Sequence, residues 1–129
     1  MAQKFATAIN CMDGRTQIPV IEWLKENYKV DYVDMITEPG PDGVLSKNID
    51  NQIIESLRRK AEISAYKHNS KIIVIAGHHD CAGNPVDKDT HINQIKLSVQ
   101  TIKSWGLPFE KVIGLWVNEN WEIEKVIEI

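Results

Sequence analysis

The chain has 129 residues, of which 43 % are hydrophobic and 26 % charged, and its formal net charge is -3 with a pI of about 5.8. This length and composition are ordinary for a single globular domain spanning residues 1–129, and the acidic balance lacks the basic surface typical of nucleic-acid binders. No apolar run approaches the length needed to span a membrane. From the charge balance and this observation together, we expect neither nucleic acid nor membrane among the partners.

The pattern of apolar residues predicts strands and helices that alternate along the chain. Short runs rich in β-branched residues predict four strands, at residues 5–10, 31–36, 71–76 and 112–117. The run at 71–76 contains Ile-Ile-Val-Ile, which is typical of a strand buried on both faces.

Apolar residues at helical spacing predict three helices between these strands. They begin near Thr16, Ser46 and Thr90, because the hydroxyl of each of these residues can cap a helix. The expected buried stripes are Ile18, Ile21, Leu24 and Tyr28 in the first helix, Ile49, Ile53, Leu57 and Ala61 in the second, and Ile92, Ile95, Val99 and Ile102 in the third.

The remaining segments are expected to be loops. Residues 38–43 form a Pro- and Gly-rich turn, residues 77–89 a long polar loop, and residues 118–120 a turn. His68 and His91 fall at expected helix ends, where solvent would surround them. The last nine residues, 121–129, fit either an edge strand or a frayed helical turn.

The order of elements predicts an α/β fold with three layers. Strands that alternate with helices give a mostly parallel sheet of four strands with helices on both faces, here in the order 2-1-3-4, with residues 121–129 as a candidate extra edge strand. In such a sheet the first and third strands are neighbours. The crevice at the switch point lies between their carboxyl ends, where ligands bind in this fold class.

Both cysteines of the chain follow these two strands. Cys11 comes directly after the first strand, and His78 and Cys81 come after the third. Two thiolates and one imidazole make a three-ligand zinc site with an open fourth position, which is typical of catalytic zinc. The segment from Met1 to Asn10 is too short in apolar residues for a signal peptide, so we expect a reducing cytoplasm and no disulfide.

These two segments resemble the zinc site of the β-class carbonic anhydrases. That family combines Cys-x-Asp-x-Arg with a downstream His-x-x-Cys, and this chain has Cys11-Met12-Asp13-Gly14-Arg15 and His78-His79-Asp80-Cys81. The strand before the histidine, Ile-Ile-Val-Ile-Ala-Gly, is similar as well, and the resemblance extends from about residue 5 to residue 117.

The resemblance implies a function and a role for each residue. Cys11, His78 and Cys81 would hold Zn2+, and a zinc-bound hydroxide would hydrate carbon dioxide reversibly to bicarbonate. Asp13 would orient that hydroxide and Arg15 would hold Asp13, which makes these two the catalytic residues. In some members the equivalent aspartate occupies the fourth zinc position, and the sequence leaves this open.

The resemblance also implies a homodimer or a higher oligomer, because the family's active site lies at a subunit interface. Larger members begin with helices that embrace a second subunit, whereas this chain starts almost directly at its first strand. The residue 38–43 loop also differs from the family's Gly-rich segment. We therefore expect an altered pocket with intact zinc ligands.

Three other functions remain open at this point. The same scaffold could hydrolyse carbonyl sulfide or carbon disulfide, or the chain could be a non-catalytic zinc-binding or regulatory protein. A thiol redox protein is disfavoured because no Cys-x-x-Cys pair exists. Individually, Asp13 could be only a helix cap, the cysteines could be small core residues, and His79 could either shuttle protons or simply line the loop.

Overall fold

The computed structural model describes residues 3–129 and contains one five-stranded sheet in the order β2-β1-β3-β4-β5. Met1 and Ala2, the first residues of the segment judged not to be a signal peptide, lie outside the described residues. Four strands are parallel, and β5 joins β4 in antiparallel orientation. The strands are β1 Phe5–Asn10, β2 Tyr32–Thr37, β3 Ile72–His78, β4 Lys111–Val117 and β5 Ile123–Glu128. The predicted order 2-1-3-4 is confirmed, and residues 121–129 supply the extra edge strand.

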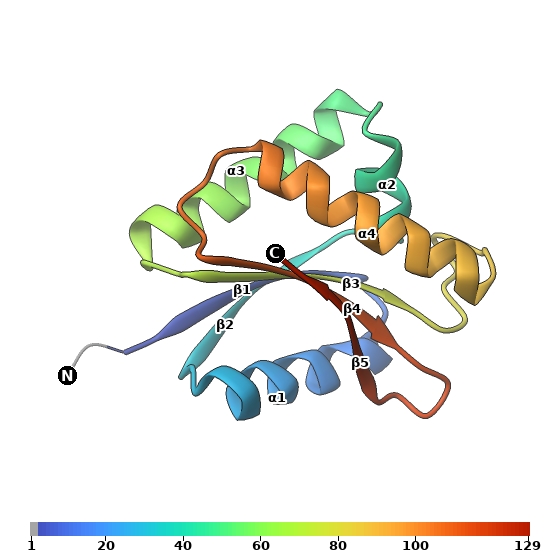
Figure 1. The fold of residues 1–129 in the computed structure, drawn as a ribbon, viewed down its shortest axis with the longest axis horizontal. Helices are drawn as coiled ribbons and strands as arrows, with labels where there is room; N and C mark the ends of the chain where they lie inside the picture. The colour runs from blue at the N-terminus through green and yellow to red at the C-terminus, as the bar shows by residue number, and fades with distance from the viewer. Residues whose placement is uncertain (1–2) are drawn as a thin grey trace.

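Helices cover both faces of the sheet, as the three-layer prediction requires (Figure 1). Helix α1, Gln17–Tyr28, lies on one face after a short 3-10 turn at Gly14–Thr16. Helices α2 Pro41–Lys47, α3 Asn51–Lys67 and α4 Lys88–Ser104 lie on the other. Within residues 3–129, none of the helices has the length and apolar character required to span a membrane.

Side-chain alternation along β3 divides the core into two clusters. Ile73 and Ile75 face the layer of α2, α3 and α4, whereas Val74 and Ala76 face α1. The next two residues continue this alternation, because successive side chains of a strand point to opposite faces. Gly77 therefore lies beneath α2 and α4, where Asp42 and Ile95 pack against it, and His78 points to the other side.

The number of helices is the main correction to the sequence prediction. Residues 38–43 are not only a turn, because α2 begins at Pro41. Proline suits this first helical position, where its fixed φ is favourable and its missing N–H is not needed. Ser46 consequently lies inside α2 and does not cap the next helix.

The true caps of the longer helices are aspartates. The carboxylate of Asp50 accepts a hydrogen bond from the backbone N–H of Ile53 at the start of α3, and Asp87 does the same for Thr90 at the start of α4. A carboxylate satisfies an orphan N–H and also favours the positive end of the helix dipole. Thr16 does precede α1, but its hydroxyl donates backwards to the carbonyl of Asp13.

The shifted helix starts also change two burial predictions. Ile49 precedes α3 and is 78 % exposed, so it does not belong to the buried stripe, which instead includes Ile54, Leu57 and Ala61. His91 lies in the first turn of α4 and is only 1 % exposed. The expectation that solvent surrounds His91 is therefore wrong, because α4 begins early enough to turn this residue toward the sheet.

We predict that Gly77→Ala destabilises the fold. A Cβ atom at this position would overlap Asp42 Oδ2 and lie 3.1 Å from Ile95 Cδ1, so β3 and its covering helices would have to separate. Overpacking of this kind costs about 1–3 kcal/mol, which urea unfolding measures. Gly14→Ala is the matched control, since a Cβ there meets nothing within 4 Å. Equal stability of the two variants would contradict the prediction.

Candidate metal centre

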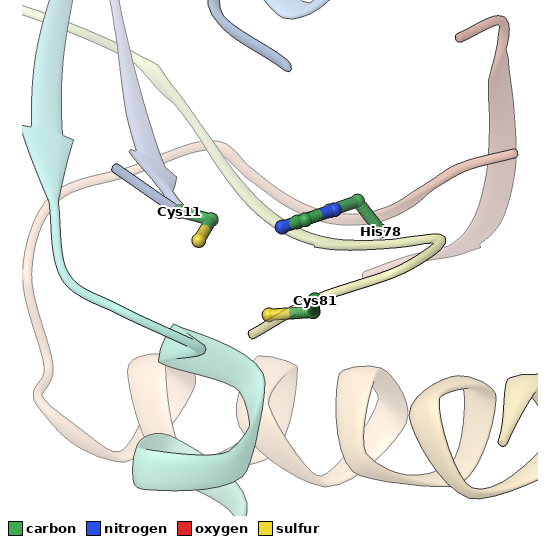
Figure 2. Close-up of side chains that lie close together, drawn as sticks. All are labelled: Cys11, His78 and Cys81. Atoms are coloured by element: carbon green, nitrogen blue, oxygen red, sulfur yellow. The ribbon is translucent and has the colours of Figure 1, made fainter. Parts of the chain in front are cut away.

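Three side chains from two adjacent strand ends converge below the surface. Cys11 follows β1, His78 is the last residue of β3, and Cys81 lies in the turn after it. One nitrogen of His78 and the two sulfurs all lie within 4.8 Å of one another, and all three residues are buried. Figure 2 shows the ring of His78 directed toward the two sulfur atoms. The structure thus brings the three predicted ligands into one group that could hold a metal ion.

The imidazole of His78 is oriented as a metal ligand. Its Nδ1–H donates a hydrogen bond of 2.7 Å to the carbonyl oxygen of His79, which fixes the ring and leaves the lone pair on Nε2. That Nε2 is buried and has no hydrogen-bond partner among residues 3–129. An unpartnered buried nitrogen costs free energy unless something binds it. Two sulfurs and one imidazole nitrogen fit zinc, so the donor set suits the predicted metal.

Backbone amides surround the two sulfurs. The backbone N–H groups of Gly40 and Asp13 lie beside the Cys11 sulfur, and those of Gly83 and Asn84 lie beside the Cys81 sulfur. The Cys81 thiol also donates to Cys11 and holds the pKa of Cys11 far below its usual range, while the same contact raises the pKa of Cys81. For His78, burial lowers the pKa, but the nearby Cys11 sulfur and the hydrogen bond to the His79 carbonyl outweigh it and raise the pKa overall. Without metal, one sulfur therefore carries a negative charge beside the imidazole.

A carboxylate–guanidinium pair lies next to this group. Arg15 donates to both oxygens of Asp13, with Nε to Oδ1 at 3.0 Å and Nη2 to Oδ2 at 2.7 Å. These bonds lower the pKa of Asp13 to about 2, so the carboxylate is ionised at any ordinary pH. The 20 % exposed Asp13 side chain also caps the 3-10 turn through the N–H of Arg15, so the expectation of a capping role is confirmed alongside the pairing with Arg15.

Two further residues hold Arg15, and sequence reasoning missed both. Asp80 accepts hydrogen bonds from Arg15 at its carboxylate, 3.3 Å, and at its carbonyl, 3.2 Å. The guanidinium carbon lies 4.4 Å from the ring centre of Trp121, within the range of a cation–π contact. Asp80 stands inside the His-x-x-Cys segment and could have been suspected, whereas the Trp121 contact depends on tertiary packing.

Trp121 adopts a backbone conformation that is unusual for its type. Its φ is +59°, in the left-handed region, where a bulky side chain is strained. The turn before it enforces this conformation, because Asn118 accepts hydrogen bonds from the N–H groups of Asn120, Trp121 and Glu122. The indole ring also lies near His78 and His79, with ring centres 6.3 and 6.4 Å apart. Trp121 is thus held next to His78 and Arg15.

Comparison with known proteins identifies the family of this chain and agrees with its fold. Residues 1–127 match the model of a family described as "putative carbonic anhydrase", and the chain therefore belongs to that family. No curated protein sequence matches.

Solved structures show the same fold at low identity. A β-carbonic anhydrase from Trichomonas vaginalis is 19 % identical with a TM-score of 0.63, over 98 % of this chain and 84 % of that one. One of two tetrameric β-carbonic anhydrases from Sordaria macrospora is 14 % identical with a TM-score of 0.55, over 100 % and 83 %. An apo carbon disulfide hydrolase is 13 % identical with a TM-score of 0.53, over 99 % and 80 %. The predicted resemblance to β-class carbonic anhydrases is confirmed as membership of the family and as likeness of fold.

We predict that the metal-free protein keeps about one thiolate per chain at a pH roughly two units below the ordinary cysteine pKa of about 8.5. The lowered pKa of Cys11 keeps this residue ionised there, and its charge disappears only when the pH falls through that lowered pKa. Ultraviolet absorbance of the thiolate during a pH titration measures the effect. Cys11→Ala should abolish the signal, and Cys81→Ala should move it to higher pH because the donor thiol is lost. A titration identical in all three proteins would contradict the prediction.

Proposed function

We propose that this protein binds Zn2+ through Cys11, His78 and Cys81 and hydrates carbon dioxide reversibly to bicarbonate. The observation that carries the proposal is the unpartnered, buried Nε2 of His78, which faces two sulfurs beside an ionised carboxylate. A purely structural zinc site takes four protein ligands and needs no such carboxylate. Family membership and the fold of the β-carbonic anhydrase neighbours support the same function.

The contacts between Asp13 and Arg15 support the following roles in this proposal. When bound, zinc supplies a Lewis acid that lowers the pKa of a coordinated water toward roughly 7. Asp13 accepts a hydrogen bond from the attacking water and directs the lone pair of its oxygen at the substrate carbon. Arg15 keeps Asp13 ionised and fixed in this orientation through its two hydrogen bonds. Both of these residues act only if the carboxylate stays with Arg15 and leaves the fourth metal position to water.

A second candidate function is hydrolysis of carbon disulfide or carbonyl sulfide by the same group of residues. The likeness to a carbon disulfide hydrolase, which spans 99 % of this chain, favours keeping this candidate. All three substrates are linear and present an electrophilic carbon, so the residues proposed for carbon dioxide would serve for each. Rates measured side by side on carbon dioxide, carbonyl sulfide and carbon disulfide distinguish the two functions. A zinc-loaded protein inactive on all three would favour a non-catalytic zinc-binding role.

We further propose that residues 1–129 act as one cytoplasmic domain that assembles with copies of itself. The proposal rests on family membership and on the tetrameric state named for the Sordaria macrospora enzymes. We predict a dimer or larger oligomer in sedimentation velocity at micromolar protein concentration. A species of monomer mass that persists as the concentration is raised would overturn this prediction.

The catalytic proposal is tested by separating metal binding from turnover. Asp13→Ala should retain zinc, measured by metal analysis, yet lose most carbon dioxide hydration in a stopped-flow assay, because Asp13 does not hold the metal. Arg15→Ala should retain zinc and lose about 10–100-fold in activity, the usual effect of removing a partner of a site residue. Cys81→Ala should lose both metal and activity.

Lys25→Ala, on the exposed side of α1, serves as the control for these three variants and should change neither measurement. Full hydration activity in Asp13→Ala, or zinc retained at wild-type affinity in Cys81→Ala, would contradict the proposed roles.

A further inference from the structure

A fully buried carboxylate lies beside the candidate metal centre and takes no part in the proposed chemistry. Asp42, in the first turn of α2, is 0 % exposed. Its Oδ1 accepts hydrogen bonds from the N–H of Gly43 at 3.0 Å and from Asn84 Nδ2 at 3.1 Å, and its Oδ2 accepts one from His91 Nδ1 at 2.5 Å. Burying a carboxylate is costly unless donors surround it, so these contacts hold three separate segments of chain together.

The residues around Asp42 are themselves buried, and their polar groups bond to Asp42 or to one another. His91 is 1 % exposed, and its other nitrogen, Nε2, has no hydrogen-bond partner among the described residues, so Asp42 is the polar contact that the ring gains on burial. Asn84 is 6 % exposed and gives its second amide hydrogen to Gln94 Oε1 at 2.6 Å. Helix α4 thus reaches Asp42 directly through His91 and indirectly through Gln94 and Asn84.

The cluster of Asp42, Asn84 and His91 connects two turns, and each turn lies against one of the cysteine sulfurs. The backbone N–H of Gly40 lies beside the Cys11 sulfur, and those of Gly83 and Asn84 lie beside the Cys81 sulfur. These turns touch at backbone distance, since a Cβ on Gly40 would lie 2.6 Å from Asn84 Cβ and 2.7 Å from the Gly83 carbonyl oxygen. Gly40 also has a φ of +54°, which favours glycine. The two turns can approach this closely only because Gly40 and Gly83 have no side chains. Attractive contacts between the turns are needed to keep them together.

We propose that the Asp42–Asn84–His91 cluster is a positioning device that clamps the Gly40 turn to the Gly83–Asn84 turn and so fixes the amide donors and the spacing of Cys11 and Cys81. Asp42 follows Gly40 by two residues and binds the side chain of Asn84 across the contact, which joins the two turns by one buried hydrogen bond. His91 anchors the same carboxylate to α4. The expected consequence of the clamp, tighter metal binding, rests on the proposed function. The clamp itself is a property of the metal-free chain.

The first experiment measures amide hydrogen exchange in the metal-free protein by NMR. Asn84→Ala removes the bond that crosses between the turns, and Asp42→Asn leaves one acceptor oxygen where there were two. Both variants should speed exchange at Gly40, Gly83 and residue 84 by tenfold or more relative to amides in β3.

Ser64→Ala is the matched control for both variants. Ser64 is 2 % exposed and donates to Asp34, and it also contacts Thr7, in a different buried polar cluster. This control should lose global stability without selectively changing exchange at the two turns. If Asp42→Asn fails to fold, Asn84→Ala carries the test, since it alters no buried charge. Exchange at the turns that matches the Ser64→Ala pattern would overturn the proposal.

The second experiment measures zinc affinity by competition with a chromophoric chelator at a temperature where every variant is folded. Loss of a group that holds metal ligands in place typically weakens binding 10–100-fold, which is the expectation for Asn84→Ala and Asp42→Asn, with Ser64→Ala at wild-type affinity. Faster exchange at the turns with unchanged affinity would overturn the positioning role. If the wild-type protein binds no zinc, the proposed function fails, and the exchange experiment alone decides whether the clamp exists.

Discussion

The parallel pairing of β1 with β3 is the constraint on which the rest of this structure depends. The register Thr7–Ile73, Ala8–Val74 and Ile9–Ile75 places the carboxyl ends of the two strands side by side. Residues 67 positions apart in the chain, Cys11 and His78, meet for this reason alone. Apart from Thr7, the buried residues of the two strands are apolar until their carboxyl ends, so polar side chains gather where the strands end, as is general for open α/β sheets.

Among residues 3–129, only three buried side-chain nitrogen or oxygen atoms lack a hydrogen-bond partner: Nε2 of His78, Nε2 of His91 and Nε1 of Trp116. Both carboxylate oxygens of Asp42 accept hydrogen bonds, whereas Nε2 of His78, which faces the sulfurs, has no partner among the described residues. Because buried polar groups are almost always paired, the exception is informative. The Nε2 of His91 and the Nε1 of Trp116 also lack partners among the described residues, and their rings lie 5.2 Å apart on the opposite side of the sheet from His78. Those two lack the sulfur donors that make the His78 position suitable for a metal.

The sequence was informative wherever a short pattern determines the outcome. Alternating apolar runs predict the strands and their order, and the two cysteine-containing segments predict which side chains meet. The predicted starts of the second and third helices were wrong because the carboxylates of Asp50 and Asp87, and not the nearby hydroxyls, cap these helices. A shift of one turn in a helix start changes which side chains are buried. Helix α2 was missed because a Pro-Gly segment is also typical of a turn. The contacts of Trp121 with Arg15 and of His91 with Asp42 join residues far apart in the chain, and no local pattern encodes them.

The alternation of Gly77 and His78 at the end of β3 makes the candidate metal centre depend on correct strand alignment. Gly77 fits beneath α2 and α4 only because it has no side chain, and His78 reaches the sulfurs only because it faces the other way. A slip of one residue between β1 and β3 would exchange these faces, so that an imidazole would collide with Asp42 and the cysteines would lose their nitrogen partner. A chain in that wrong alignment would keep both thiols but lack the three-ligand set. A metal ion held by all three residues would therefore stabilise the correctly aligned molecules selectively.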